Sequence, residues 1–236
     1  MKKFLLRLMM LTVPVSDGAF ANPLTAVPEG DYRPLKAAEA EEVTDGFEAA
    51  WIAALGDLMG REITLGKKPG QADLRFGAVH PRAIYYSSRI AALTAASSGP
   101  AQWKDLSSET FCVMAGSPHA DFVVSTYGGV AREYPSAAQT LIGLKLDECQ
   151  AVVADEVLLQ HIASLPEWRR YNRLLPPLDN QALDLGVKAG DPTVQRQIEQ
   201  VASSPAGKAK LASITQQWID EVAFQAYVLA DTLDCH

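Results

Sequence analysis

Residues 148–155 read Glu-Cys-Gln-Ala-Val-Val-Ala-Asp, a short apolar run that ends on a carboxylate. The run is too short, and too closely bounded by polar residues, to form the core of a helix, so it favours a strand buried on both faces of a parallel sheet. In open α/β sheets, ligands bind beyond the carboxyl ends of the strands. Asp155 stands at such an end and is therefore a candidate ligand-binding residue.

A second apolar run, residues 111–115, is followed by Gly116, Ser117 and Pro118. Serine is a favoured helix N-cap and proline suits the first helical position, so we predict a helix that begins here with Ser117 as its cap. If this strand lies beside the strand that ends at Asp155, the two strand ends form one wall of a cleft for a small molecule.

The rest of the chain alternates between the same two kinds of element. We predict strands at 25–27, 63–65, 72–77 and 182–187, and helices at 47–59, 120–127, 137–146, 156–164, 192–201 and 207–233. Residues 174–179 are rich in proline and are interpreted as a return loop between two lobes, and residues 96–100 as a hinge. The alternation indicates an α/β fold with mostly parallel sheets and flanking helices.

The first 21 residues have the features of a signal peptide: a basic start, an apolar middle and Ala19-Phe20-Ala21 as a cleavage site. We therefore expect an exported, periplasmic protein cleaved near Ala21. The net charge of −7 becomes −9 without this leader, whose own charge is +2. Such acidity, without a basic face, argues against binding to nucleic acid or to anionic membrane surfaces.

Three cysteines follow the leader, and export permits a disulfide. Cys112 and Cys149 are the natural pair, since each begins one of the two strands placed side by side, and Cys235 would be free or intermolecular. None of the four histidines stands at metal-ligand spacing from another candidate ligand, so we expect neither a metal site nor a cofactor.

In its order of motifs, the chain resembles the family 3 extracellular solute-binding proteins, the periplasmic receptors of polar amino-acid ABC importers. The motifs that carry the resemblance are residues 29–35, 46–48, 72–74, 103–106, 112–117, 151–156 and 186–191, with Gly207, Ile214 and Trp218 near the end. The paired cysteines also resemble a subgroup of this family, the general L-amino-acid binders.

The resemblance implies a two-lobed fold, the Venus flytrap, that closes on its ligand. Lobe 1 would comprise residues 22–95 and 179–236, lobe 2 residues 96–178, and two hinge strands would link them. The implied partners are a small-molecule ligand, an amino acid or a similar zwitterion, and an ABC permease in the inner membrane. We expect the receptor to be a monomer.

The same resemblance assigns ligand contacts to four residues. Tyr32 would stack on the ligand side chain, and Arg82 would bind the ligand carboxylate in a bidentate way. Ser117, with its helix N-terminus, would bind the same carboxylate, and Asp155 would hold the ammonium group.

Each of these residues also has a structural interpretation. Asp155 would be a helix cap, Arg82 a surface arginine, Tyr32 a residue packed at the edge of the core and Ser117 a cap alone. His80 and His119 are interpreted as loop residues, and Trp51 and Trp218 as core.

Departures from the family pattern leave a second function open. Gly77, Ala78 and Val79 stand where the family usually has hydroxyl residues before the arginine, and Pro118 has no N–H to offer a carboxylate. The alternative is a receptor-like interaction protein with a degraded cleft that docks on a membrane sensor or a periplasmic enzyme.

A third possibility is an enzyme on the same scaffold, with Asp155 or Glu156 as general acid. A lone acid without a positioned base is weak support for catalysis. We therefore predict that the protein is not an enzyme and has no catalytic residues.

Overall fold

The structure, a computed structural model, describes residues 22–66, 70, 72–79 and 82–233. The predicted leader, His80 and Cys235 lie outside these residues. The strands are β1 (Leu24–Pro28), β2 (Ile63–Leu65), β3 (Leu74–Val79), β4 (Ala83–Thr94), β5 (Thr110–Met114), β6 (Val130–Tyr134), β7 (Ala151–Asp155) and β8 (Arg173–Ala189). The helices are α1 (Phe47–Met59), α2 (His119–Tyr127), α3 (Ala137–Lys145), α4 (Glu156–Ser164), α5 (Pro192–Ser203) and α6 (Pro205–Leu233), with short 3-10 turns at Trp103–Leu106 and Pro166–Trp168.

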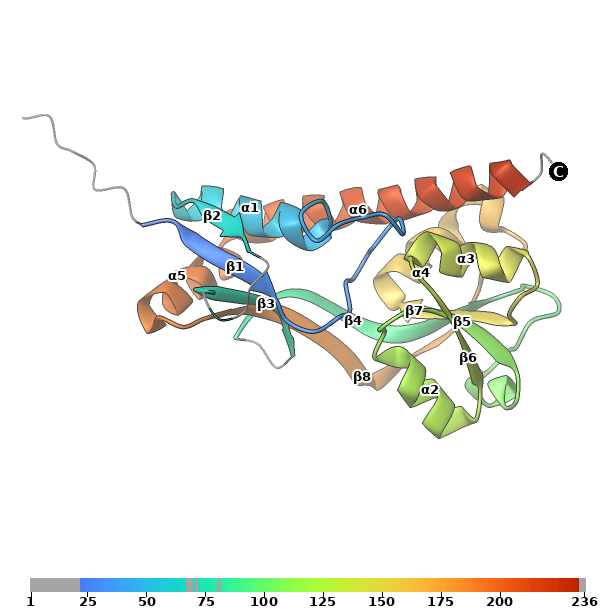
Figure 1. Cartoon of the computed structure of the whole chain (residues 1–236). Helices are drawn as coiled ribbons and strands as arrows, with labels where there is room; N and C mark the ends of the chain where they lie inside the picture. Colours follow the sequence, from blue (N-terminus) through green and yellow to red (C-terminus); the bar gives the residue numbers. More distant parts are fainter. Residues whose placement is uncertain (1–21, 67–69, 71, 80–81, 234–236) are drawn as a thin grey trace, which may run out of the picture.

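All eight strands form one curled sheet in the order β2-β1-β3-β8-β4-β7-β5-β6. Pairing is parallel within each end of the sheet, whereas β4 and β8 are antiparallel to each other and to their outer neighbours. We call the end formed by β1, β2 and β3 with α1 and α5 lobe 1, and the end formed by β5, β6 and β7 with α2, α3 and α4 lobe 2 (Figure 1). The predicted α/β fold with two lobes is confirmed.

The predicted loop at residues 174–179 is wrong, because β8 runs without a break from Arg173 to Ala189. Its two prolines, Pro176 and Pro177, lie where the pairing of β4 with β8 shifts register, between the pairs Ile90–Leu178 and Ala92–Leu175. A proline is tolerated in a strand at such an irregularity, because no ladder hydrogen bond is lost there. The long strands β4 and β8 thus cross from one lobe to the other.

Helix ends follow local sequence signals in most cases. Helix α1 ends at Gly60, which adopts the left-handed conformation (φ 62°) common after helices. The Ser136 hydroxyl caps α3 by accepting a hydrogen bond from the N–H of Gln139, and Asp191 caps α5. These boundaries agree with the predicted ones to within about two residues.

Helix α2 departs from its prediction by one position. Pro118 is the N-cap and His119 the first helical residue, so Pro118 is not inside the helix as predicted. Ser117 still contributes a capping hydrogen bond, since its hydroxyl accepts from the N–H of His119 at 3.3 Å. The shift places His119 in the first turn of a helix, with consequences for the site described below.

Two further elements connect the lobes besides β4 and β8. Helix α6, 29 residues long, packs against α1 and α5 of lobe 1 and against α3 and α4 of lobe 2 (Figure 1). Its buried face contributes Ile214, Ile219, Val222 and Ala226 to a hydrophobic core that extends through both lobes. The segment 29–46, between β1 and α1, also reaches lobe 2, where the Lys36 carbonyl accepts a hydrogen bond from the N–H of Ala137.

The predicted disulfide between Cys112 and Cys149 is present, with 5.7 Å between the two Cα atoms. It ties β5 to the segment that precedes β7, so it braces the two strands whose ends lie at the predicted site. A bond that closes a loop of this length contributes about 2–4 kcal/mol to stability. Trp51 is a core residue, as predicted, and Trp218 is half-buried against the core.

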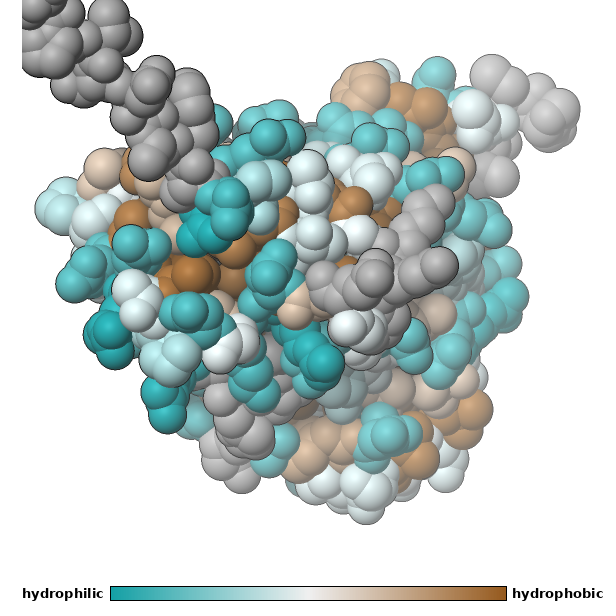
Figure 2. All heavy atoms as spheres, turned by 60° about the vertical axis from the view of Figure 1, so that its left-hand side comes forward, coloured by the Kyte–Doolittle hydropathy of each residue, from teal (hydrophilic) through white to brown (hydrophobic). Residues whose placement is uncertain are grey.

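The surface is mixed. Viewed with the lobe 1 end forward, hydrophilic side chains predominate, and apolar ones show between them in small patches (Figure 2). Among the described residues, none of the helices is both long and apolar enough to span a bilayer.

Candidate ligand-binding site between the lobes

Asp155 ends β7 and lies at the junction of the lobes, with 2% of its surface exposed. Its Oδ2 accepts hydrogen bonds from the hydroxyls of Tyr32 and Tyr86, each at 2.7 Å. Its Oδ1 contacts Nε2 of His119 at 2.8 Å. Tyr32 lies in the segment after β1 and Tyr86 in β4, both of which connect the lobes, and His119 lies in lobe 2. The connecting elements and lobe 2 thus meet at this carboxylate.

These contacts determine the ionisation of Asp155. Burial alone would raise the pKa of its carboxyl, but the hydrogen bond and charge of His119 and the hydrogen bonds of Tyr32 and Tyr86 outweigh burial and lower this pKa. Burial and the neighbouring Asp155 raise the pKa of both tyrosines well above the usual value. Asp155 is therefore an anion held among three donors.

Little space remains beside this cluster. The cavity lined by Tyr32, Ser117 and Asp155 has a volume of about 20 Å³. One water molecule needs about 10–15 Å³ by the same kind of measure, so the cavity holds about one water. An ammonium group carried by an amino acid has no room next to Asp155 in this arrangement.

Three of the four predicted contact residues lie together, and the fourth lies elsewhere. Tyr32, Ser117 and Asp155 surround the small cavity. Arg82 is exposed and immediately precedes β4, whose residue Ile90 is the one that pairs with Asp155. Ile90 is eight residue steps along the chain from Arg82, roughly 25 Å at about 3.3 Å per step. The guanidinium of Arg82 therefore does not face Asp155.

Two members of the cluster were not predicted. His119, interpreted above as a loop residue, is buried to 2% exposure at the start of α2, so that interpretation is wrong. The Ser117-Pro118 pair does mark a helix start, and this was the available signal for His119. For Tyr86 the signal would have been its strand register, which depends on the pairing of β4 with β7.

A larger cavity of about 410 Å³ lies next to this cluster. It opens at the carboxyl ends of β1, β5 and β6, where α/β folds place their ligands. Lobe 2 contributes Met114, Ala115 and Pro135, and the other lining residues are Asp31, Arg33, Pro34, Lys36, Glu41, Glu42, Val43, Gly46, Phe47 and Glu48.

Glu48, in the first turn of α1, is the buried carboxylate of this larger cavity, with 4% of its surface exposed. The Tyr85 hydroxyl donates a hydrogen bond to its Oε1. Its Oε2 lies 3.4 Å from Nε of Arg33 and accepts no hydrogen bond. Burial raises the pKa of Glu48 to about 7, although Tyr85 and Arg33 act in the opposite direction.

Gly77, one of the three departures from the family pattern noted above, has a structural reason. Its φ is +81°, and a Cβ atom there would lie 2.8 Å from the carbonyl oxygen of Glu29. The same Cβ would approach the side chains of Arg33 and Glu48 at 3.4 and 3.5 Å. Only glycine fits this position, because it alone combines a positive φ with no side chain.

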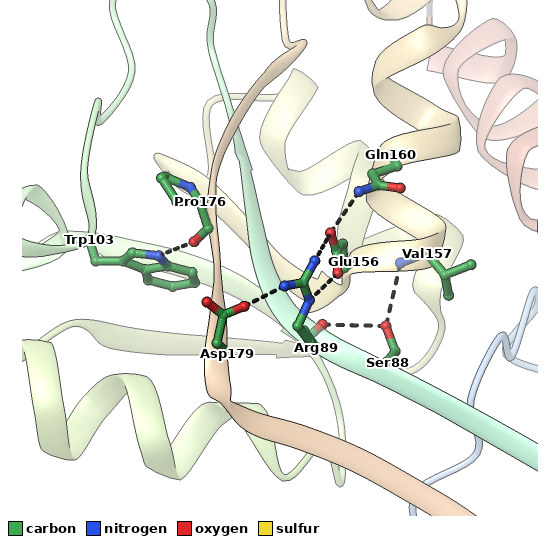
Figure 3. A network of polar contacts seen from close by, with 8 residues as sticks. All are labelled: Ser88, Arg89, Trp103, Glu156, Val157, Gln160, Pro176 and Asp179. Atoms are coloured by element: carbon green, nitrogen blue, oxygen red, sulfur yellow. Dashed lines mark hydrogen bonds and ion pairs between the residues drawn. The ribbon is translucent and has the colours of Figure 1, made fainter. Parts of the chain in front are cut away.

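Glu156, the residue after Asp155, belongs to a separate polar network at the crossing of β4 and β8 (Figure 3). Arg89 donates two hydrogen bonds to Glu156, at 2.7 and 2.8 Å, and a further one to Asp179. Asp179 lies where the β4–β8 register jumps from Arg89–Ala182 to Ile90–Leu178. The network thus ties both crossing strands to the start of α4.

No three His, Cys, Asp or Glu side chains gather as a possible metal site within the described part of the chain.

No protein-family model matches the sequence, and no curated protein matches it significantly. Solved structures do resemble it. The arginine-, lysine-, histidine-binding protein ArtJ from Geobacillus stearothermophilus is 12% identical, with a TM-score of 0.59, and the match covers 84% of this chain and 95% of that one. A periplasmic binding protein of an arginine transport system from Legionella pneumophila is 15% identical, with a TM-score of 0.56 and coverage of 84% and 100%.

An ancestral amino acid-binding protein, described as a precursor of cyclohexadienyl dehydratase, is 13% identical, with a TM-score of 0.58 and coverage of 84% and 95%. The similarity thus extends over nearly the whole of each compared chain, at low sequence identity. The chain therefore has the two-lobed α/β fold shared by these amino-acid-binding proteins.

Proposed function

We propose that this protein is a solute-binding receptor that captures a small polar zwitterion, an amino acid or a close analogue, between its two lobes. The observation that carries the proposal is the cavity of about 410 Å³ at the carboxyl ends of β1, β5 and β6, lined by residues of both lobes. Its volume lies within the usual range of small-molecule sites. Charged groups of both signs line it, as a zwitterion requires.

The similar structures support the wider setting of this proposal. One is named as the substrate-binding protein of an amino acid ABC transporter, and another as a periplasmic binding protein. In our proposal the protein works as a periplasmic monomer and delivers its solute to an ABC importer in the inner membrane. The leader 1–21 directs export, and lobe 1 and lobe 2 approach each other on binding.

Two observations favour the alternative, a receptor-like interaction protein with a degraded cleft. Asp155 was expected to bind the ligand ammonium. Its carboxylate oxygens instead contact the side chains of Tyr32, Tyr86 and His119. Helix α6 also packs on both lobes and would resist their separation. In this alternative the closed shape itself is what a membrane sensor or a periplasmic enzyme recognises.

Catalysis by the two acids considered from sequence has little support. A general acid needs a proton to give near neutral pH, yet the pKa of Asp155 is lowered, with three donors around its carboxylate. Glu156 accepts hydrogen bonds from Nε and Nη2 of Arg89, so its carboxylate is already paired.

Thermal unfolding in the presence of amino acids, opines and polyamines tests the proposal. A ligand with micromolar affinity, added at millimolar concentration, should stabilise the protein by about 4 kcal/mol through mass action. A melting temperature that does not respond to any compound would reject the receptor function and favour the interaction protein. Turnover of a compound in the panel would instead indicate an enzyme.

A further inference from the structure

We propose that the ligand of the larger cavity is a small aliphatic amine, cationic at neutral pH, and that its ammonium group binds Glu48 rather than Asp155. This inference rests on the proposed capture of a solute between the lobes; it names the binding residue and extends the ligand class from zwitterions to cationic amines. The two buried carboxylates differ in the space and the hydrogen-bonding capacity that each still offers.

Glu48 has an acceptor that the protein leaves unused. Its Oε2 is buried and receives no hydrogen bond, while Oε1 is occupied by Tyr85. A buried carboxylate oxygen without a donor is unfavourable, and such groups in native structures call for an explanation. The Arg33 guanidinium lies 3.4 Å from Oε2 but donates no hydrogen bond to it, so an ammonium group in the cavity would supply the missing donor.

The charges around the cavity favour a cation. Four carboxylates, of Asp31, Glu41, Glu42 and Glu48, line it against two basic groups, of Arg33 and Lys36. All three nitrogens of Arg33 are already engaged: Nη1 and Nη2 donate to the carbonyls of Tyr32 and Gly30, and Nε faces Glu48. The amino end of α1 also lies at the wall, and Glu48 in its first turn offsets its partial positive charge.

The opposite wall indicates an aliphatic rather than a purely polar ligand. Lobe 2 contributes Met114, Ala115 and Pro135, which are apolar and offer no charged partner. A molecule with an ammonium group at one end and methylene groups behind it would place the ammonium against Glu48 and the methylene groups against this wall. Linear diamines, polyamines and lysine have this chemistry.

Calorimetric titration of the purified protein with 1,5-diaminopentane, spermidine, L-lysine, L-glutamine and L-glutamate tests the inference. We expect at least one of the three amines to bind and L-glutamate not to bind. Glu48→Gln should weaken amine binding at least tenfold, because it removes the charge and keeps the size and the acceptor for Tyr85. Glu62→Gln, which makes the same change at an exposed carboxylate after α1, should bind as the wild type does.

A second variant removes the space and leaves Glu48 intact. Ala115→Phe adds a large side chain on the lobe 2 wall and should also abolish amine binding, while the melting temperature of the empty protein reports whether each variant is folded.

The outcomes separate the two proposals. If only L-glutamine or L-glutamate binds, the receptor function stands and the amine class is rejected. If an amine binds equally well to Glu48→Gln and to the wild type, the site is rejected and the receptor function stands. If no compound binds, both are rejected.

Discussion

Asp155 and Glu48 are two buried carboxylates at the boundary between the lobes, and they differ in almost every other respect. Asp155 accepts hydrogen bonds from two tyrosines and a histidine, beside a cavity of about 20 Å³. Glu48 accepts one hydrogen bond, from Tyr85, beside a cavity of about 410 Å³. Burial disfavours the charge of both groups, but only Asp155 has enough donors to reverse this effect.

This difference suggests a division of roles. A carboxylate whose donors come from the connecting elements and from lobe 2 stabilises the junction of the lobes. A carboxylate with an unused oxygen and open space is prepared for an external partner, at a cost in stability while the cavity is empty. Adjacent residues of β4 serve the two sites, because Tyr85 contacts Glu48 and Tyr86 contacts Asp155.

The largest expected effect is on Asp155. Asp155→Ala would leave the donors of Tyr32, Tyr86 and His119 buried without their acceptor, and we expect a loss of about 3–5 kcal/mol in the free energy of unfolding measured with urea. Since the pKa of Asp155 is lowered in the folded state, its contribution should also disappear as the pH falls through that pKa.

An exposed aspartate in α1 provides the control for this experiment. Asp57→Ala should change stability by less than about 0.5 kcal/mol. If Asp155→Ala loses no more than this control, the role of Asp155 in holding the lobes is rejected.

Glu48 should show the opposite pH dependence. Its pKa rises from 4.5 to about 7 on folding, so the folded state keeps a proton that the unfolded state has released between these pH values. Stability should therefore fall, by on the order of 3 kcal/mol, as the pH rises from 4.5 to above 7. Glu48→Gln should lack this loss and exceed the wild type in stability at pH 8.

Urea unfolding of both proteins at pH 5 and pH 8 measures this difference. The two curves should nearly coincide at pH 5, where the Glu48 carboxyl is neutral in the folded wild type. Equal pH dependence in the two proteins would show that Glu48 is not the group that titrates.

Tyr85 and Tyr86 allow a direct comparison of the two carboxylates, because replacing either tyrosine by phenylalanine removes a single hydroxyl that donates to one of them. Tyr86→Phe should cost about 2 kcal/mol at pH 7, because a hydrogen bond to a fully charged carboxylate is lost. Tyr85→Phe should cost about 1 kcal/mol, because Glu48 is partly protonated at this pH. Thermal unfolding of both variants measures the order, and the reverse order would contradict the assigned charge states.

The smallest expected effect is at Arg89, outside both cavities. Arg89→Lys would replace the bidentate hydrogen bonding to Glu156 by a single hydrogen bond. The Arg89 side chain is 42% exposed, so we expect a loss below about 1 kcal/mol in urea unfolding. Ligand binding should not change, and a weakened affinity would mean that the strand crossing influences the cavity.

Local patterns in the sequence predicted much of the fold. Helices 47–59 and 156–164 were predicted with the observed bounds, because apolar spacing and the residues at their ends act over short range. The strand ending at Asp155 and the disulfide partner of Cys149 were also predicted. By contrast, the prediction split strand β8 into a loop and a shorter strand, because prolines usually interrupt strands. They fit here because the register of the β4–β8 pairing shifts at that point.

The sequence by itself indicated that Asp155 ends a buried strand and that Ser117 follows a neighbouring one. Its resemblance to a known family added the two lobes and the place of Tyr32 near Asp155. Only the tertiary structure showed that Tyr86 and His119 bond to the Asp155 carboxylate and that Arg82 lies far from it. The same holds for Glu48 Oε2, which accepts no hydrogen bond. These facts depend on strand register and on contacts between residues up to 69 positions apart in the chain. A sequence pattern specifies the periodicity of an element, whereas the register between elements is fixed only when they pack.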